Sequence, residues 1–264
     1  VGICPVIYTA HGFHFYKGAP ILNWVIYYPV ERFLSMYTDV LITINREDYQ
    51  RALRFAADEV VYIPGIGVDT TTFSGTKVKR NAKRHQLGIS EEMFVIVSVG
   101  ELNKNKNHEV VLRAISQIDE PLLYLLCGRG ENLVYLQALA KSLDISDRIN
   151  FLGFRNDVSE IYQSADLFIL PSYREGLSVA LMEAMASGLP CVVSRIRGNV
   201  DLIDDPQCLV KPYNIDGFAD FIRRAMRDVT WRASMGLRNR EKIRGFSSEY
   251  VKKEMRKVYR DALG

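Results

Sequence analysis

Short apolar runs alternate with amphipathic stretches of helix length along almost the whole of this 264-residue chain. The runs are rich in Val, Ile and Leu, which is typical of buried strands. Strands that alternate with helices form parallel sheets with helices on both faces, because each parallel connection needs a crossover. We therefore predict an α/β fold. The predicted strands are residues 6–10, 40–44, 60–63, 94–99, 122–127, 149–152, 167–170, 191–194 and 208–210.

The predicted helices fill the segments between these strands. Pro29 lies inside the first helix and is expected to kink or break it, since proline removes a backbone hydrogen bond. Ser247 is a suitable N-cap for the last helix. The helices are predicted at residues 21–37, 46–56, 79–87, 107–117, 131–143, 156–163, 178–187, 198–203, 214–227 and 247–262.

A polar, basic stretch at residues 74–91 interrupts the alternation once, and we interpret it as a linker between two domains. Six strands follow it, enough for a doubly wound sheet, whereas the three that precede it are fewer than the usual ~5. The first domain is therefore expected to be truncated and to expose apolar surface on the 21–37 helix and on unpaired strand edges. The predicted division is a partial first domain at 1–75, a linker at 76–91, a second domain at 92–240 and a C-terminal helix at 241–264 that can cross back to the first domain.

The composition is that of a soluble globular protein, with 48% hydrophobic and 25% charged residues. No apolar run approaches the ~20 residues that a membrane-spanning helix needs. The four cysteines show no CxxC spacing, and Cys127 and Cys191 lie inside strand-like runs. This pattern favours a reducing compartment and argues against a metal site. We therefore expect a cytoplasmic protein.

Charge and aromatic residues are unevenly distributed. Residues 223–264 hold thirteen Lys or Arg against five Asp or Glu, and residues 13–37 hold eight aromatic residues. Basic surface with interfacial aromatics can mark peripheral contact with an anionic membrane. The alternative, a solvated helical tail and an aromatic core, stays open.

The segment from Glu175 to Glu183 (EGLSVALME) is the most informative motif. It follows the 167–170 strand and opens a helix, whose first N–H groups and positive dipole end form an anion site suited to phosphate. Eight helical residues rise by roughly 12 Å, so the two carboxylates can contact both ends of one elongated ligand with a central diphosphate. A solvated helix with two unrelated acids is the alternative.

Three further strand ends have the character of a nucleotide site, because strand ends of such sheets face the ligand crevice. After the 94–99 strand come Gly100, Lys104 and Lys106, and the two lysines can neutralise phosphate. The 122–127 strand is followed by a glycine pair around Arg129, which lacks the third glycine of a dinucleotide fingerprint. Gly153 follows the next strand and can let a base pack against the main chain.

In the first domain, His11 and His14 lie just past the end of the 6–10 strand. A histidine at this place can reach a reacting sugar across the cleft. A structural hydrogen-bonding role is the alternative.

Together these segments resemble glycosyltransferase family 4, which comprises retaining enzymes of the GT-B fold with two Rossmann-like domains. The resemblance rests on "REGLSVALMEAMASGLPCVVS", supported by "GIGVDTTTF", "VGELNKNKNH", "CGRG", "FLGF" and "SADLFILPS" in that order. The opening "TAHGFHFYKGAP" is similar to that of bacterial capsule and exopolysaccharide transferases.

The resemblance implies an acceptor-side first domain and a donor-binding second domain. It implies catalytic roles for His11, Lys106 and Glu175, with Glu175 on hydroxyls of the donor sugar and Glu183 on the ribose. It implies a nucleotide-sugar donor, with UDP as the favoured nucleotide. It also implies an acceptor that is lipid-linked or a growing surface glycan. No metal, other cofactor or nucleic-acid partner is expected. Substrate-binding residues are expected to be Gly100, Lys104, Arg129, Gly153, Gly176, Leu177, Ser178 and Glu183.

Glu101 departs from the family pattern, which commonly has an arginine there. A carboxylate beside a diphosphate would cost ~1 to 4 kcal/mol, so Glu101 is expected to point away, with Lys104 or Arg129 supplying the positive charge. Two other functions stay open: a sugar-nucleotide-binding fragment without catalysis, and a sugar-nucleotide epimerase on the same fold.

Overall fold

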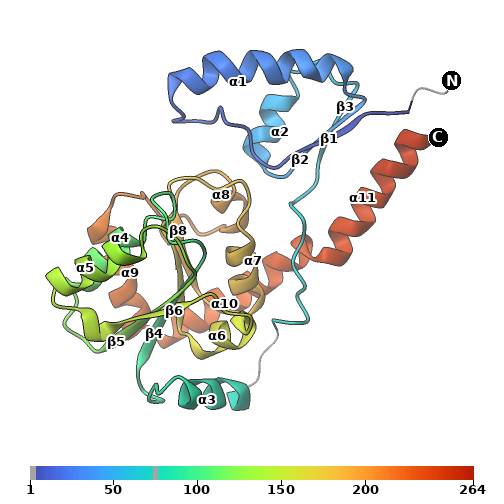
Figure 1. The fold of residues 1–264 in the computed structure, drawn as a ribbon. Helices are drawn as coiled ribbons and strands as arrows, with labels where there is room; N and C mark the ends of the chain where they lie inside the picture. The colour runs from blue at the N-terminus through green and yellow to red at the C-terminus, as the bar shows by residue number, and fades with distance from the viewer. Residues whose placement is uncertain (1–3, 74–76) are drawn as a thin grey trace.

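The computed structural model describes residues 4–73 and 77–264, with no side-chain description for residues 77–79. The start of the predicted linker at residue 76 lies outside the described residues. Two parallel sheets, each with its own helices, form two domains that lie side by side (Figure 1). Among the described helices, none is long and apolar enough to cross a membrane.

The first sheet has the order β1-β2-β3, with strands Ile7–Ala10, Val40–Thr43 and Glu59–Tyr62. The helices α1 (Ile21–Leu34) and α2 (Arg46–Ala52) connect them, and a short 3₁₀ turn follows α1. One core cluster joins Phe13 and Phe15 to Leu41, with Trp24 and Tyr28 of α1 packed against it. The first sheet therefore has one face covered by its own connecting segments.

The second sheet contains the larger core and has the order β6-β5-β4-β7-β8-β9. The strand order reverses direction between β4 and β7, so the carboxyl ends of these two strands form the crevice where ligands bind in such sheets. Its strands are β4 (Phe94–Val99), β5 (Leu122–Cys127), β6 (Ile149–Gly153), β7 (Leu167–Leu170), β8 (Cys191–Ser194) and β9 (Leu209–Val210). Its helices are α4 (His108–Ile115), α5 (Leu133–Ser142), α6 (Val158–Ser164), α7 (Val179–Ala186), α8 (Asn199–Leu202) and α9 (Ile215–Arg227).

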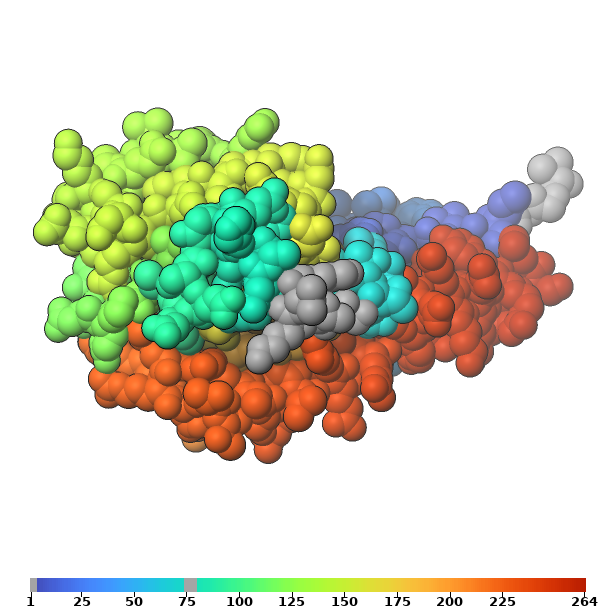
Figure 2. All heavy atoms as spheres, turned by 90° about the horizontal axis from the view of Figure 1, so that it is seen from below, coloured from blue at the N-terminus to red at the C-terminus, as the bar shows by residue number. Residues whose placement is uncertain are grey.

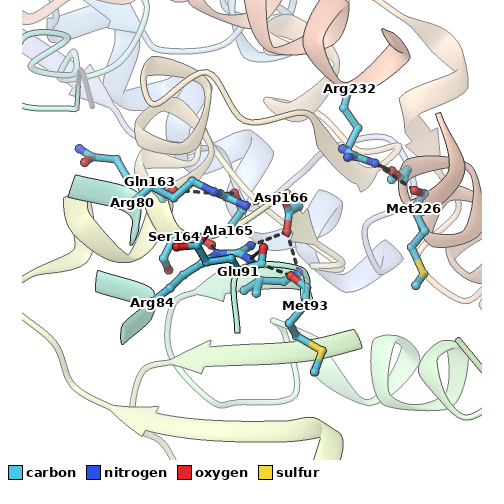
Figure 3. Close-up of polar contacts among 12 residues, drawn as sticks. Arg80, Arg84, Glu91, Met93, Gln163, Ser164, Ala165, Asp166, Met226 and Arg232 are labelled. Carbon is cyan, nitrogen blue, oxygen red and sulfur yellow. Dashed lines mark hydrogen bonds and ion pairs between the residues drawn. The ribbon is translucent and has the colours of Figure 1, made fainter. Parts of the chain in front are cut away.

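Most of the segment interpreted as a linker is the helix α3 (Lys77–Gln86), which packs firmly on the second domain (Figure 2). Arg84 is buried and donates to the carbonyl oxygens of Ser164, Glu91 and Met93. It also pairs with Asp166 at 2.7 Å, as does Arg80 from the same helix (Figure 3). The basic residues Arg80 and Arg84 thus dock α3 onto the second domain.

The last two helices have different partners. α11 (Ser248–Leu263) leaves the second domain and covers the other face of the first sheet, where Val251 packs with Val40, Ile42 and Ile63 (Figure 1). Before it, α10 (Val229–Ile243) packs against α7. No helix was predicted at residues 229–243. That omission was wrong, because the buried residues of α10 do recur every four positions, from Trp231 to Ile243, around the polar Asn239.

Two features of α1 bear on the predictions. The helix continues through Pro29 to Leu34, so Pro29 does not break it, and the alternative of a kink at Pro29 stays a prediction. No residue of α1 is buried, and its outer face exposes Ile21, Leu22, Val25 and Phe33 to between 55% and 82%. The predicted apolar surface on this helix is therefore present, and β1 lies at an edge of its sheet.

Candidate active site

The loops that follow β4 and β7 are bonded to each other and form the floor of the candidate site. Asn105 accepts a hydrogen bond from the N–H of Tyr173 at its carbonyl oxygen (2.8 Å), and its side chain donates to the carbonyl of Arg174 (2.9 Å). The residues that follow Asn105 and Arg174 in the two loops form an ion pair, in which Lys106 Nζ lies 2.6 Å from Glu175 Oε1. The structure therefore brings together two predicted catalytic residues that are 69 positions apart.

The predicted anion site lies at the start of α7, which begins with a side-chain cap. Ser178 is the N-cap, and its hydroxyl accepts a hydrogen bond from the N–H of Leu181. The predicted phosphate-binding loop from Gly176 to Ser178 immediately precedes this first turn, which carries the positive end of the helix dipole. An anion here would meet backbone donors and the Lys106 ammonium group.

Glycine lets the two domains touch at this loop. A Cβ at Gly176 would collide with the carbonyl oxygen of His11, and a Cβ at Gly65 would lie 2.7 Å from the Leu177 side chain. Close backbone approach of this kind requires a residue without a Cβ. The loop that carries His11 is thus placed directly on the loop that carries Glu175.

A polar hollow of about 220 Å³ forms where these loops meet. His11 and His14 line it from the first domain, and Asn105, Glu175 and Arg197 line it from the second. The predicted catalytic histidine and carboxylate therefore face the same space from different sheets. Arg197 was not among the predicted site residues, although it stands three positions beyond the end of the predicted strand at 191–194.

His11 also borders a second, apolar hollow of about 420 Å³ between the first sheet and α11. Ile42, Ile44 and Ile63 line the sheet side. On the helix side, Met255 and Tyr259 stand beside the exposed cations Lys252 and Arg256. His11 thus lines both the polar hollow that contains Glu175 and the apolar hollow that Lys252 and Arg256 border.

Glu183 lies on α7, half-buried, with Tyr162 donating to its Oε2 at 3.2 Å. Burial raises the pKa of Glu183, and the tyrosine hydrogen bond opposes that shift. Burial raises the pKa of Tyr162 well above its usual value, so the phenol remains a donor at neutral pH. A carboxylate held in this way is suited to accept hydrogen bonds from a diol.

The remaining predicted residues are spread along the strand ends. Gly100 packs against the aliphatic part of Lys106, and a Cβ at Gly128 would collide with the carbonyl of Gly100. Gly153 has φ +66°, the left-handed region that glycine favours, and its carbonyl accepts the N–H of Gly128. β4, β5 and β6 are thus joined at their carboxyl ends by close glycine contacts.

The residues expected to compensate for Glu101 lie at the surface. Glu101 is exposed and accepts from the Asn103 side chain at 2.8 Å. Arg129 is exposed as well, and Lys104 lines a separate hollow with Tyr135 and Tyr173 rather than the one that contains Glu175. The compensation by Lys104 or Arg129 stays a prediction.

A chain of buried polar groups supports the floor from below. The His108 ring lies 3.3 Å from the Tyr124 hydroxyl, which donates to Ser98 at 2.8 Å. Burial lowers the pKa of His108 to about 4, with Lys106 adding to the shift. His108 is therefore neutral at physiological pH, and it fixes the start of α4 directly behind Lys106. In the part of the chain that the structure describes, no three His, Cys, Asp or Glu side chains gather as metal ligands.

Two parallel α/β domains that face each other across such a cleft define the GT-B class of glycosyltransferases. Solved structures of this class share the fold. HepE of Anabaena in complex with UDP matches 97% of this chain and 72% of its own with a TM-score of 0.87 at 18% identity. WaaG, a glycosyltransferase involved in lipopolysaccharide biosynthesis, matches 94% of this chain and 75% of its own, with a TM-score of 0.76 at 19% identity.

Sequence comparison is more specific. The model of glycosyl transferases group 1 matches residues 79–242, from within α3 to within α10, and the chain belongs to this family. EpsD of Bacillus subtilis, named as a glycosyltransferase, is 38% identical over 262 residues, 96% of this chain and 69% of EpsD. A UDP-Gal:alpha-D-GlcNAc-diphosphoundecaprenol alpha-1,3-galactosyltransferase of Escherichia coli is 33% identical over 226 residues, 82% of this chain and 56% of that enzyme. The chain thus spans 69% of the length of the first of these two curated relatives and 56% of the length of the second.

Proposed function

We propose that this chain carries the active site of a retaining glycosyltransferase of family 4, which moves a sugar from a UDP-linked donor to a lipid-linked or growing surface glycan. The observation that supports the proposal most directly is the polar hollow shared by His11 and Glu175. A transferase needs donor-binding and acceptor-side groups to face one reacting carbon from opposite walls of a cleft.

The donor is placed along the carboxyl ends of the second sheet. The N–H groups of Gly176, Leu177 and Ser178, together with Lys106, receive the diphosphate. Glu183 receives the ribose hydroxyls and Glu175 the hydroxyls of the sugar. Two comparisons support UDP as the nucleotide of the donor: the E. coli relative is named for its donor UDP-Gal, and the HepE structure is a complex with UDP.

In the proposed step, the bond between the anomeric carbon and the diphosphate oxygen breaks, and the acceptor oxygen bonds to the same face of that carbon. The leaving phosphate oxygen takes the acceptor's proton. Negative charge grows on the diphosphate, where prearranged cations and N–H donors stabilise it. We propose that these groups suffice without a metal ion, so transfer is expected to persist in excess chelator.

The acceptor is placed on the first domain beside His11. The apolar hollow with Lys252 and Arg256 on its wall is compatible with an amphiphilic, anionic acceptor. The E. coli relative acts on a diphosphoundecaprenol-linked sugar, which has this chemistry. We propose a cytoplasmic protein that binds peripherally to the membrane surface, where lipid-linked acceptors are found. The exposed apolar face of α1 supports this contact.

Calorimetric titration with UDP, GDP and their common sugar conjugates tests the donor assignment. Micromolar affinity for UDP that is lost in Glu183→Ala would agree with the proposal. A folded protein that binds no nucleotide would contradict it. Product analysis with a sugar-diphosphate-lipid acceptor, including the anomeric configuration by NMR, then separates a retaining transferase from an epimerase and from a binding fragment.

A further inference from the structure

Arg197 is a buried cation at the boundary between the two domains. It lies between β8 and α8, and its side chain is only 5% exposed. Burying a charge is costly unless it is paired and hydrogen-bonded. The position therefore requires partners, and these partners come from both sides of the cleft.

The guanidinium group contacts three separate segments of the chain. It donates from Nη1 to Asp48 Oδ1 of α2 at 2.7 Å, in the first domain. It donates from Nε to the carbonyl of Glu175 at 3.3 Å, in the second domain. Its Cζ also lies 4.6 Å from the centre of the Tyr16 ring, within the range of a cation–π contact.

Asp48 is itself fixed within the first domain, so the bond reaches a rigid partner. Its Oδ2 accepts from the N–H of Phe13 (3.1 Å) and from the side chain of Asn45 (2.8 Å). Asp48 is fully buried, and so is Asn45, the N-cap residue of α2. The pair therefore joins Arg197 to the segment that runs directly on from His11.

We propose that Arg197 is a positioning residue that latches the two domains together, holding the His11 loop against the Glu175 loop in the geometry used for transfer. The catalytic consequence rests on the proposed function, whereas the latch itself does not. Arginine suits this place because its planar fork can satisfy two acceptors and stack on a ring, which a lysine ammonium cannot do.

Two observations agree with a latch at this seam. A Cβ at Gly12 would lie 3.1 Å from an Arg197 Nη atom, so the backbone next to His11 packs directly on the guanidinium. A second polar contact crosses the seam nearby, where the N–H of Arg46 donates to Asp201 Oδ2 at 2.7 Å. The closed arrangement thus depends on specific bonds as well as on apolar contact.

The test is a distance measurement between the domains by electron–electron double resonance. Spin labels are placed at the exposed positions Leu53→Cys and Val134→Cys, with Cys4→Ser to remove the exposed one of the four native cysteines. The label sites lie in different domains, Leu53 at the end of α2 and Val134 on α5. Arg197→Met is compared with Arg197→Lys, with the double variant Asp48→Asn/Arg197→Met, and with Arg195→Met, an exposed arginine two positions away.

The latch predicts one narrow distance distribution for the parent and for Arg195→Met. Arg197→Met is expected to show at least a tenfold larger population of longer distances, and Arg197→Lys an intermediate one. The double variant is expected to open no further than Arg197→Met, because coupled residues are not additive. A folded Arg197→Met protein with the parent's distribution would overturn the proposal. Should Arg197→Met not fold, the double variant decides, because it leaves no unpaired buried charge.

Titration with UDP and a transfer assay separate the latch from the proposed function. A parent protein that binds no UDP would count against the transferase assignment and leave the distance result readable. Where transfer is measurable, a latch predicts that Arg197→Met lowers kcat at least tenfold while the donor KM changes less than threefold. An unchanged kcat in a protein that has opened would overturn the positioning role.

Discussion

Lys106 Nζ lies 2.6 Å from Glu175 Oε1, and both side chains are largely withdrawn from solvent, with exposures of 19% and 12%. The cation predicted for the diphosphate and the carboxylate predicted for the sugar therefore neutralise each other. A donor that contacts both has to share this pair rather than meet two free charges. The ion pair also joins the loop after β4 to the loop after β7.

Lys106→Met is expected to weaken UDP binding by roughly 10- to 100-fold, since a hydrogen bond to a charged group contributes about 1.5–3 kcal/mol. Isothermal titration calorimetry measures this change. Lys104→Met is expected to weaken UDP binding less, because Lys104 is exposed and lines a different hollow. Equal losses in the two variants would mean that the loop's general charge, and not the placement of Lys106, attracts the nucleotide.

Gly176→Ala is expected to abolish transfer while the second domain stays folded, because the new methyl group would meet the His11 carbonyl across the cleft. The domains would have to move apart to accommodate it. Transfer activity and the thermal unfolding curve are the measurements. Gly245→Ala, where a Cβ meets nothing within 4 Å, should behave as the parent protein. Full activity in Gly176→Ala would show that the observed contact between the loops is not needed.

Acid stability should depend on His108. Its folded pKa of about 4 lies below the ordinary value of 6.5, so the unfolded chain binds more protons between these limits. The stabilisation is thus fully present above pH 6.5 and is lost as the pH falls towards 4. Urea unfolding at a series of pH values should show a shallower loss over this interval in His108→Gln than in the parent. The exposed His85→Gln should retain the parent's slope.

Glu183→Gln should separate stability from binding. The raised pKa of Glu183 means that the folded state disfavours its charge, a cost that appears as the pH rises through the folded pKa. At pH 7 the neutral amide is therefore expected to melt at or above the parent's temperature, while UDP binding weakens. A lower melting temperature together with intact UDP binding would assign Glu183 a structural role instead.

Arg84→Met tests whether α3 belongs to the second domain. It leaves a carboxylate and several buried carbonyl groups with fewer partners, and breaking a buried pair costs about 3–5 kcal/mol. Denaturant unfolding should show a loss of this order, with a smaller loss in Arg80→Met, whose side chain is 27% exposed. A surface linker would predict no difference between the two.

Local pattern sufficed for most of the elements. Each predicted strand is found, with ends shifted by at most one residue, because buried parallel strands read as short apolar runs between helical segments. The helix α10 was missed, since its buried face is interrupted by Asn239, whose side chain bonds the distant carbonyl of Leu189. The contacts of α3 could not be predicted for a similar reason, because buried arginines look like solvated ones until their acceptors are known.

Strand and helix periodicity and short motifs are local properties, so the α/β alternation, the loops that carry the site and the family could be predicted from the residues alone. Which of these loops meet depends on the folded arrangement of the two domains. The pairs Lys106–Glu175 and Asp48–Arg197 join residues 69 and 149 positions apart. The energy of such pairs comes from burial and geometry that exist only once both domains have folded and closed on each other.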